Sequence, residues 1–122
     1  MKANVYVMMP SCVPATAIDD NGCTLTAEDM VPYLHNSRIL GLGEVMDSIS
    51  VVQGEKSMHD KLELFEGRIR DGHAPFLEEG DLQAYAMAGI ATDHESSFFD
   101  YAMRERRNGH TILVREGSAA RN

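Results

Sequence analysis

Short hydrophobic runs recur along the chain, and each is ended by a glycine, a proline or a polar residue. Their hydrophobic residues stand next to one another instead of alternating with polar ones, which is typical of strands buried on both faces of a sheet. This pattern predicts five strands, at residues 5–9, 38–43, 68–71, 90–93 and 111–115.

The segments between the predicted strands have the spacing of amphipathic helices. Hydrophobic residues recur there at intervals of three and four, which places them on one face of a helix. Three such stripes are Met58-Leu62-Phe65, Leu82-Tyr85-Ala86 and Phe99-Ala102-Met103. Ile69 continues the first stripe, but we assign it to the strand that follows.

Polar residues and a proline indicate where some of these helices begin and end. Thr26 followed by Asp29 resembles a capping box at the start of a first helix. Pro32 lies inside that helix and should kink or shorten it. For the last helix, Ser96 or Ser97 is the predicted N-cap.

Strands that alternate with single helices predict an α/β fold with a parallel sheet and right-handed crossovers. We expect residues 48–56 to form a surface loop and residues 1–122 to form a single domain. A closed barrel of eight βα units typically needs about 250 residues, so this chain is too short for one. The hydrophobic pattern does not distinguish an open, doubly wound sheet from an arc of a barrel.

The chain is acidic, with 11 basic and 19 acidic residues and a net charge of −8. This charge repels phosphate backbones and anionic lipids, so we expect neither a nucleic acid polymer nor a membrane as partner. No hydrophobic run approaches the roughly 20 residues of a transmembrane helix, and the N-terminus lacks the pattern of a signal peptide. We therefore expect a cytoplasmic protein, with Cys12 and Cys23 as reduced thiols.

Three residues with metal-binding side chains follow consecutive predicted strands. Glu44 ends the second strand, His73 follows the third, and His94 follows the fourth. The carboxyl ends of parallel strands meet at one edge of a sheet, about 4.8 Å apart, so these side chains can converge. Imidazole and carboxylate suit Zn, Fe or Mn, which activate water for hydrolysis. The placement of these three residues therefore predicts a metal site.

Several other sites are excluded by their motifs. Gly41 and Gly43 could open a dinucleotide fingerprint, but Met46 stands where its third glycine belongs. No phosphate-binding loop is present, and Ser118 lacks the flanking glycines of a nucleophile elbow. The His-x-Glu and Pro-Cys-x-x-Cys motifs of cytidine deaminases are also absent.

Six blocks of the sequence closely resemble adenine deaminases of the amidohydrolase superfamily, in the family's order and over nearly the whole chain. They are Met9–Thr16, Leu25–Met30, Leu40–Asp47, Asp71–Pro75, Ala88–Glu95 and Val114–Asn122.

The resemblance implies hydrolysis of adenine to hypoxanthine and ammonia at a centre of one or two divalent ions, Mn, Fe or Zn. It makes Glu44 the carboxylate that bridges the metals, and His73 and His94 the ligands from the next two strands. The five strands would then be about the third to seventh of a TIM-like barrel, an incomplete half-barrel. Glu116 and Ser118 would line the mouth where substrate enters. Glu95 is a candidate proton shuttle only by its adjacency to His94, and we favour its interpretation as a solvated loop carboxylate.

The sequence departs from the family pattern in two ways. The resemblance implies a His-x-His pair from the first barrel strand and an Asp from the eighth that orients the attacking water, and neither is present among these 122 residues. We therefore expect little or no activity from this chain alone, and association into a homo-oligomer that buries the sheet edges. Two alternatives stay open: a metal-binding or structural module without catalysis, and an open α/β domain that binds another small molecule.

Overall fold

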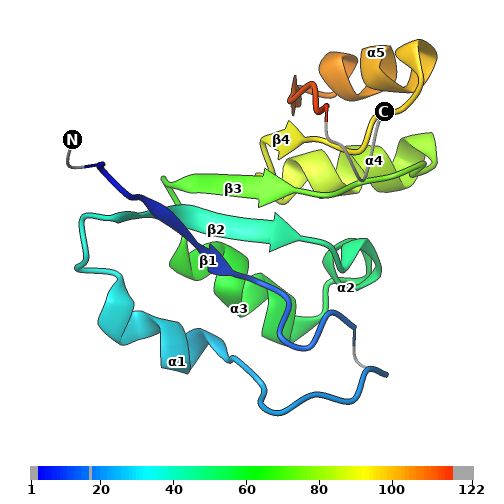
Figure 1. Cartoon of the computed structure of the whole chain (residues 1–122). Helices are drawn as coiled ribbons and strands as arrows, with labels where there is room; N and C mark the ends of the chain where they lie inside the picture. The colour runs from blue at the N-terminus through cyan, green and yellow to red at the C-terminus, as the bar shows by residue number, and fades with distance from the viewer. Residues whose placement is uncertain (1–2, 17, 117–122) are drawn as a thin grey trace.

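The computed structural model describes residues 3–16 and 18–116 of the chain (Figure 1). Its centre is a five-stranded sheet in which every neighbouring pair of strands is parallel. The strands are β1 (Val7–Pro10), β2 (Ile39–Val45), β3 (Ile69–Gly72), β4 (Thr92–Asp93) and β5 (Thr111–Ile112). Each overlaps one predicted hydrophobic run, so the predicted α/β fold is confirmed.

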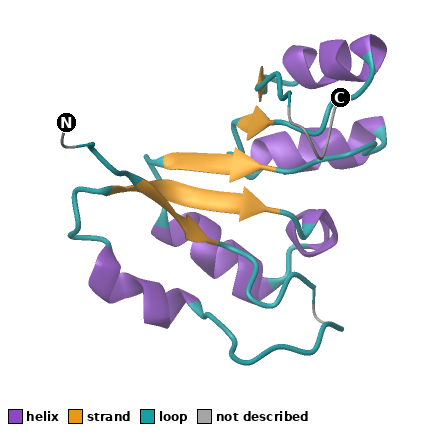
Figure 2. Ribbon diagram, in the orientation of Figure 1, coloured by secondary structure: helices purple, strands orange, loops and turns teal. Residues whose placement is uncertain are grey.

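Helices connect the strands, as Figure 2 shows in purple. They are α1 (Ala27–Met30), the 3₁₀ helix η1 (Val31–Tyr33), α2 (Ser48–Gln53), α3 (Lys56–Leu64), α4 (Glu79–Met87) and α5 (Phe99–Arg107). In the part of the chain that the structure describes, no helix combines the length and the apolar character needed to cross a bilayer.

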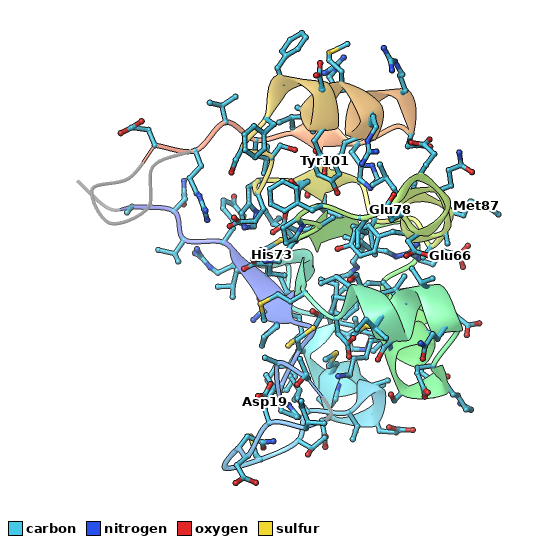
Figure 3. The ribbon with its side chains drawn as sticks, turned by 90° about the vertical axis from the view of Figure 1, so that its right-hand side faces the viewer. Asp19, Glu66, His73, Glu78, Met87 and Tyr101 are labelled. Atoms are coloured by element: carbon cyan, nitrogen blue, oxygen red, sulfur yellow. The ribbon has the colours of Figure 1, made fainter. Side chains whose placement is uncertain are left out.

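The strands lie side by side in chain order, β1-β2-β3-β4-β5. Figures 1 and 3 show the helices on one face of this curved sheet. A doubly wound fold would reverse its strand order at a switch point and place helices on both faces. A sequential order with helices on one face is the arrangement of consecutive βα units in a barrel. The sheet is therefore an arc of the barrel type, which the hydrophobic pattern alone left undecided.

The core lies between this helical layer and the sheet. Leu42 and Val45 of β2 are fully buried, as are Met30 at the end of α1 and Tyr85 of α4. Phe65, which follows α3, is also fully buried in this core. The helical stripes predicted for α3 and α4 are therefore the buried faces of these helices.

The capping box and the effect of Pro32 are confirmed. Thr26 accepts a hydrogen bond from the Asp29 amide, and the Asp29 carboxylate accepts one from the Thr26 amide, so α1 begins where the sequence predicts. The α-helix lasts only four residues, because the chain tightens into η1 with Pro32 in its first turn.

Two local predictions are wrong. Residues 48–53 form helix α2 instead of a loop, because Asp47 caps it by accepting the Ser50 amide and Gly54 ends it in a left-handed conformation. The N-cap of α5 is Phe98, without a side-chain hydrogen bond, because the Ser96 hydroxyl contacts the Glu105 carboxylate instead.

The buried face of α5 also differs from the predicted stripe. Phe99 is largely exposed, whereas Tyr101 and Glu105 are buried. The Tyr101 hydroxyl donates a hydrogen bond to the Ala74 carbonyl and accepts one from the Leu77 amide. Polar anchoring to the loop after β3 therefore sets the orientation of α5, and hydrophobicity alone did not reveal it.

Candidate metal centre

The carboxyl ends of β2, β3 and β4 bring three side chains together. Glu44 lies one residue before the end of β2, and His73 and His94 directly follow β3 and β4. One ligand atom from each of the three lies within 4.8 Å of the other two. Figure 3, viewed toward the strand ends, shows His73 in the middle of this edge. The three predicted residues thus form one cluster.

A single oxygen of Glu44 stands between the two imidazoles. Glu44 Oε1 lies 2.8 Å from His73 Nδ1 and 3.0 Å from His94 Nε2. The two rings meet edge to face, with centroids 5.6 Å apart. All three side chains are partly exposed, so the cluster is in contact with solvent.

The orientation of His73 fits a cation better than a closed hydrogen-bond network. Its Nδ1 is buried and has no hydrogen-bond partner among the described residues, although Glu44 Oε1 is only 2.8 Å away. Adjacent ligands of an octahedral ion, each about 2.1 Å from it, are about 3 Å apart. The separations of 2.8 and 3.0 Å are of this size. The two imidazole nitrogens and the carboxylate oxygen are therefore close enough together that they could hold one cation.

The Tyr85 hydroxyl fixes two of the three strand ends relative to each other. It donates to the Val45 carbonyl at 2.5 Å and accepts from the His73 amide at 3.1 Å. Tyr85 is fully buried, and this burial raises the pKa of its phenol, so the hydroxyl keeps its proton. The Tyr85 hydroxyl thus holds the backbones of Val45 and His73 in fixed positions relative to each other.

The Asp93 carboxylate connects the loop after β3 to the loop after β4. One of its carboxylate oxygens accepts the Ala74 amide at 2.7 Å, and the other accepts the Glu95 amide at 2.8 Å. Because Asp93 is fully buried, these charge-assisted bonds are shielded from water. The residues that follow His73 and His94 are therefore fixed by one carboxylate.

The end of β1 supports Glu44. The Ser11 hydroxyl donates to the Glu44 carbonyl at 2.5 Å, and Lys61 Nζ donates to the Ser11 carbonyl at 2.7 Å. Burial lowers the pKa of Lys61, and the nearby Cys12 and Asp47 oppose that shift. The loop after β1 is thereby tied both to α3 and to the backbone of Glu44.

Gly72, directly before His73, allows the strands to approach closely. A Cβ atom built at this position would lie 2.4 Å from the Thr92 carbonyl oxygen and 3.0 Å from the Tyr85 hydroxyl. No side chain fits there, so this position requires glycine.

The interpretation of Glu95 as a solvated carboxylate is wrong. Its side chain is only 19% exposed, and its Oε1 lies 3.7 Å from His73 Nδ1 and 3.8 Å from His94 Nε2. Arg115 pairs with the same oxygen at 2.6 Å. Adjacency to His94 was the only sequence signal for Glu95, and no pattern in the sequence pointed to Arg115.

The residues expected at the substrate entrance are not tested by this geometry. Glu116 is exposed and close to the end of the described chain, and Ser118 lies outside the described residues. Their role stays a prediction. The two cysteines are free, as expected.

Comparison with known proteins now bears on this cluster. The chain is 58% identical, over its full length, to an adenine deaminase of Desulfitobacterium hafniense. It is homologous along its whole length to the adenine deaminases. An adenine deaminase of Clostridium acetobutylicum is 44% identical over the full chain, and "adenine deaminase 2" of Carboxydothermus hydrogenoformans is 40% identical over 98% of it. No protein-family model matches the chain.

The chain spans about a fifth of the length of these adenine deaminases, with 21% of the Desulfitobacterium protein and 22% of the Clostridium protein covered. The homologous segment contains the βα units that carry Glu44, His73 and His94. The resemblance noted in the sequence is thus confirmed, and the candidate metal centre lies inside the segment shared with adenine deaminases.

Proposed function

We propose that this chain carries part of the metal centre of a hydrolase that converts adenine and water to hypoxanthine and ammonia. The observation that carries this proposal is the convergence of Glu44, His73 and His94 at three consecutive strand ends, in a segment homologous to adenine deaminases. A bound divalent cation, Mn, Fe or Zn, would supply the Lewis acidity that activates water for hydrolysis.

Each residue of the cluster has a distinct part in this proposal. His73 Nδ1 and His94 Nε2 offer lone pairs, and Glu44 Oε1 offers a charged oxygen between them, suited to bridge two ions. Tyr85 and Asp93 hold the strand ends so that these donors need not reorganise when the cation binds. The partial exposure of the three side chains leaves room for a neutral base to approach.

The chain alone should have little or no deaminase activity. Its 122 residues contain no His-x-His pair. A metal short of ligands and a water without a base lose most of their reactivity. We propose that these groups come from other barrel segments of an adenine deaminase-like protein.

A second candidate is a metal-binding or structural module without catalysis. It is favoured by the cluster of Glu44, His73 and His94, which offers cation donors in a segment that contains no His-x-His pair. Turnover of adenine after addition of the missing barrel segments would favour the enzyme. Tight metal binding with no turnover under any such condition would favour the module.

Other parts of the proposal concern partners and location. The net charge of −8 disfavours nucleic acid polymers and anionic membranes but does not act on a neutral base such as adenine. We propose a cytoplasmic protein with a single domain over residues 1–122, in which copies associate through the open edges of the sheet.

The test is Mn²⁺ binding to the full chain, measured by electron paramagnetic resonance of the free ion. We expect Glu44→Gln, His73→Ala and His94→Ala each to weaken binding at least tenfold. His35→Ala is the matched control, because His35 is an exposed histidine outside the cluster. Absence of binding by the unmodified chain, or an equal loss in the control, would contradict the metal centre.

A further inference from the structure

Glu95 faces the same two imidazole nitrogens as Glu44 does. Its Oε1 lies 3.7 Å from His73 Nδ1 and 3.8 Å from His94 Nε2, the two atoms that Glu44 Oε1 approaches at 2.8 and 3.0 Å. The carboxylates of Glu44 and Glu95 therefore both face the same two imidazole nitrogens.

The position of Glu95 is fixed at both ends of the residue. Its amide donates to the buried Asp93 carboxylate at 2.8 Å, and its carboxylate is held by Arg115 at 2.6 Å. Its side chain, at 19% exposure, is about half as exposed as that of Glu44, at 37%. An acidic side chain oriented this tightly toward two imidazoles is not an ordinary solvated surface group.

The three donors of the predicted centre do not fill a coordination sphere. Zn²⁺ takes about four ligands, and Mn²⁺ about six, for which carboxylate oxygens are well suited. Glu44, His73 and His94 give one atom each, which leaves positions for further oxygen donors. Glu95 Oε1 is close enough to both imidazoles to reach a cation shared by them through side-chain rotation.

We propose that Glu95 is a fourth donor of this cation site, and that Arg115 holds its carboxylate in place while no cation is bound. This inference rests on the metal centre proposed above. When the cation binds, the Glu95 oxygen turns from the guanidinium toward the ion, and its negative charge adds to that of Glu44.

The alternative is that Glu95 serves only to pair with Arg115 and order its loop. The two explanations differ in what happens when each partner is removed. If the pair is only structural, Glu95→Gln and Arg115→Gln should weaken metal binding to the same extent. If Glu95 is a donor, only Glu95→Gln should weaken it, because loss of Arg115 removes a positive charge that opposes the cation.

The experiment is Mn²⁺ titration of the full chain and of both variants, with folding of each checked by circular dichroism. We expect Glu95→Gln to weaken binding at least tenfold and Arg115→Gln to leave it unchanged or tighter. Glu66→Gln is the control, since it removes the same charge from an exposed site outside the cluster. Glu95→Asp, which keeps the charge, should recover part of the affinity.

Each outcome decides the question. Equal loss in Glu95→Gln and Arg115→Gln, or no loss in Glu95→Gln while His94→Ala abolishes binding, would overturn the role of Glu95 and leave the metal centre intact. Absence of Mn²⁺ binding by the unmodified chain would overturn the metal centre and this role together.

Discussion

Tyr85 shows how one side-chain atom can hold a site together without facing it. Among the described residues, its hydroxyl is the hydrogen-bond partner of the His73 amide, and the same hydroxyl donates to the Val45 carbonyl. Both backbone groups belong to strand ends that carry a proposed metal donor, so their separation depends on one oxygen.

We predict that Tyr85→Phe destabilises the fold by about 1–3 kcal/mol, because the His73 amide and the Val45 carbonyl lose their partner in the protein interior. Mn²⁺ affinity should fall with it, by about tenfold. Urea unfolding and metal titration measure the two effects. Tyr33→Phe, at an exposed tyrosine, should change neither. An unchanged midpoint for Tyr85→Phe would contradict the bridging role.

The buried Glu105 side chain makes the free energy of unfolding depend on pH. Burial, reinforced by the negative charge of Asp93 and opposed by the Ser96 hydroxyl, raises the pKa of Glu105 to about 7 from 4.5. Between these values the folded chain holds a proton that the unfolded chain has released. The contribution of this group to stability is therefore present at low pH and lost as pH rises to about 7.

We predict that Glu105→Gln, which imitates the protonated acid, makes the chain more stable at pH 8 by about 1 kcal/mol and has little effect at pH 4.5. The measured quantity is the difference in free energy of unfolding between variant and unmodified chain across this range. Glu63→Gln, at an exposed residue, should show no such trend. A difference that stays constant with pH would contradict the raised pKa.

The proposed metal donors could be found from the sequence, whereas the residues that hold them could not. Glu44, His73 and His94 are marked by their place after hydrophobic runs, which is a local signal. Tyr85 binds residues 12 and 40 positions away in the sequence, and Asp93 binds residues 2 and 19 positions away. Only the folded geometry therefore shows what they bind.

At the scale of elements, the sheet depends on close contact between β3 and β4. Gly72 faces the Thr92 carbonyl so closely that a methyl group cannot be placed between them. The strand pair is short, with Asp71 and Thr92 as its registered partners, so little other pairing can compensate for a displacement.

We predict that Gly72→Ala destabilises the chain by about 1–3 kcal/mol, since the strand must shift to relieve the overlap. The control is Gly80→Ala in α4, where an added Cβ meets nothing within 4 Å. That change should be neutral or stabilise by up to about 1 kcal/mol, because glycine disfavours helix. Thermal unfolding compares the two, and similar melting temperatures would contradict the steric argument.

The positions of the strands and of α3 and α4 follow from hydrophobic spacing, because their buried residues are hydrophobic. Helix α5 is different, since it buries a tyrosine and a glutamate through hydrogen bonds and leaves Phe99 exposed. Helix α2 was missed because its signals are a cap at Asp47 and a glycine at Gly54, not a hydrophobic stripe.

At the scale of the whole molecule, the two outer strands of the arc, β1 and β5, each have one neighbouring strand among the described residues. Val5, Tyr6 and Val7, at the start of the β1 edge, are each more than half exposed. An open edge flanked by exposed hydrophobic residues favours pairing with another chain.

We predict association that increases with concentration and is reduced by Tyr6→Lys, as measured by sedimentation velocity. Met87→Lys is the matched control, because Met87 is also an exposed hydrophobic residue but lies on α4 (Figure 3). A monomer at every concentration, or equal effects of the two changes, would contradict association through this edge.

Because Asp93 binds two loops, it limits how the proposed metal site can rearrange when a molecule enters. Moving either loop away would break one buried hydrogen bond to Asp93, because the same carboxylate binds the amide of Ala74 in one loop and of Glu95 in the other. Deuterium exchange at these two amides should therefore be slow and matched in rate. Room for an incoming molecule must therefore come from rotation of the imidazole and carboxylate side chains, while the backbone of the two loops stays in place.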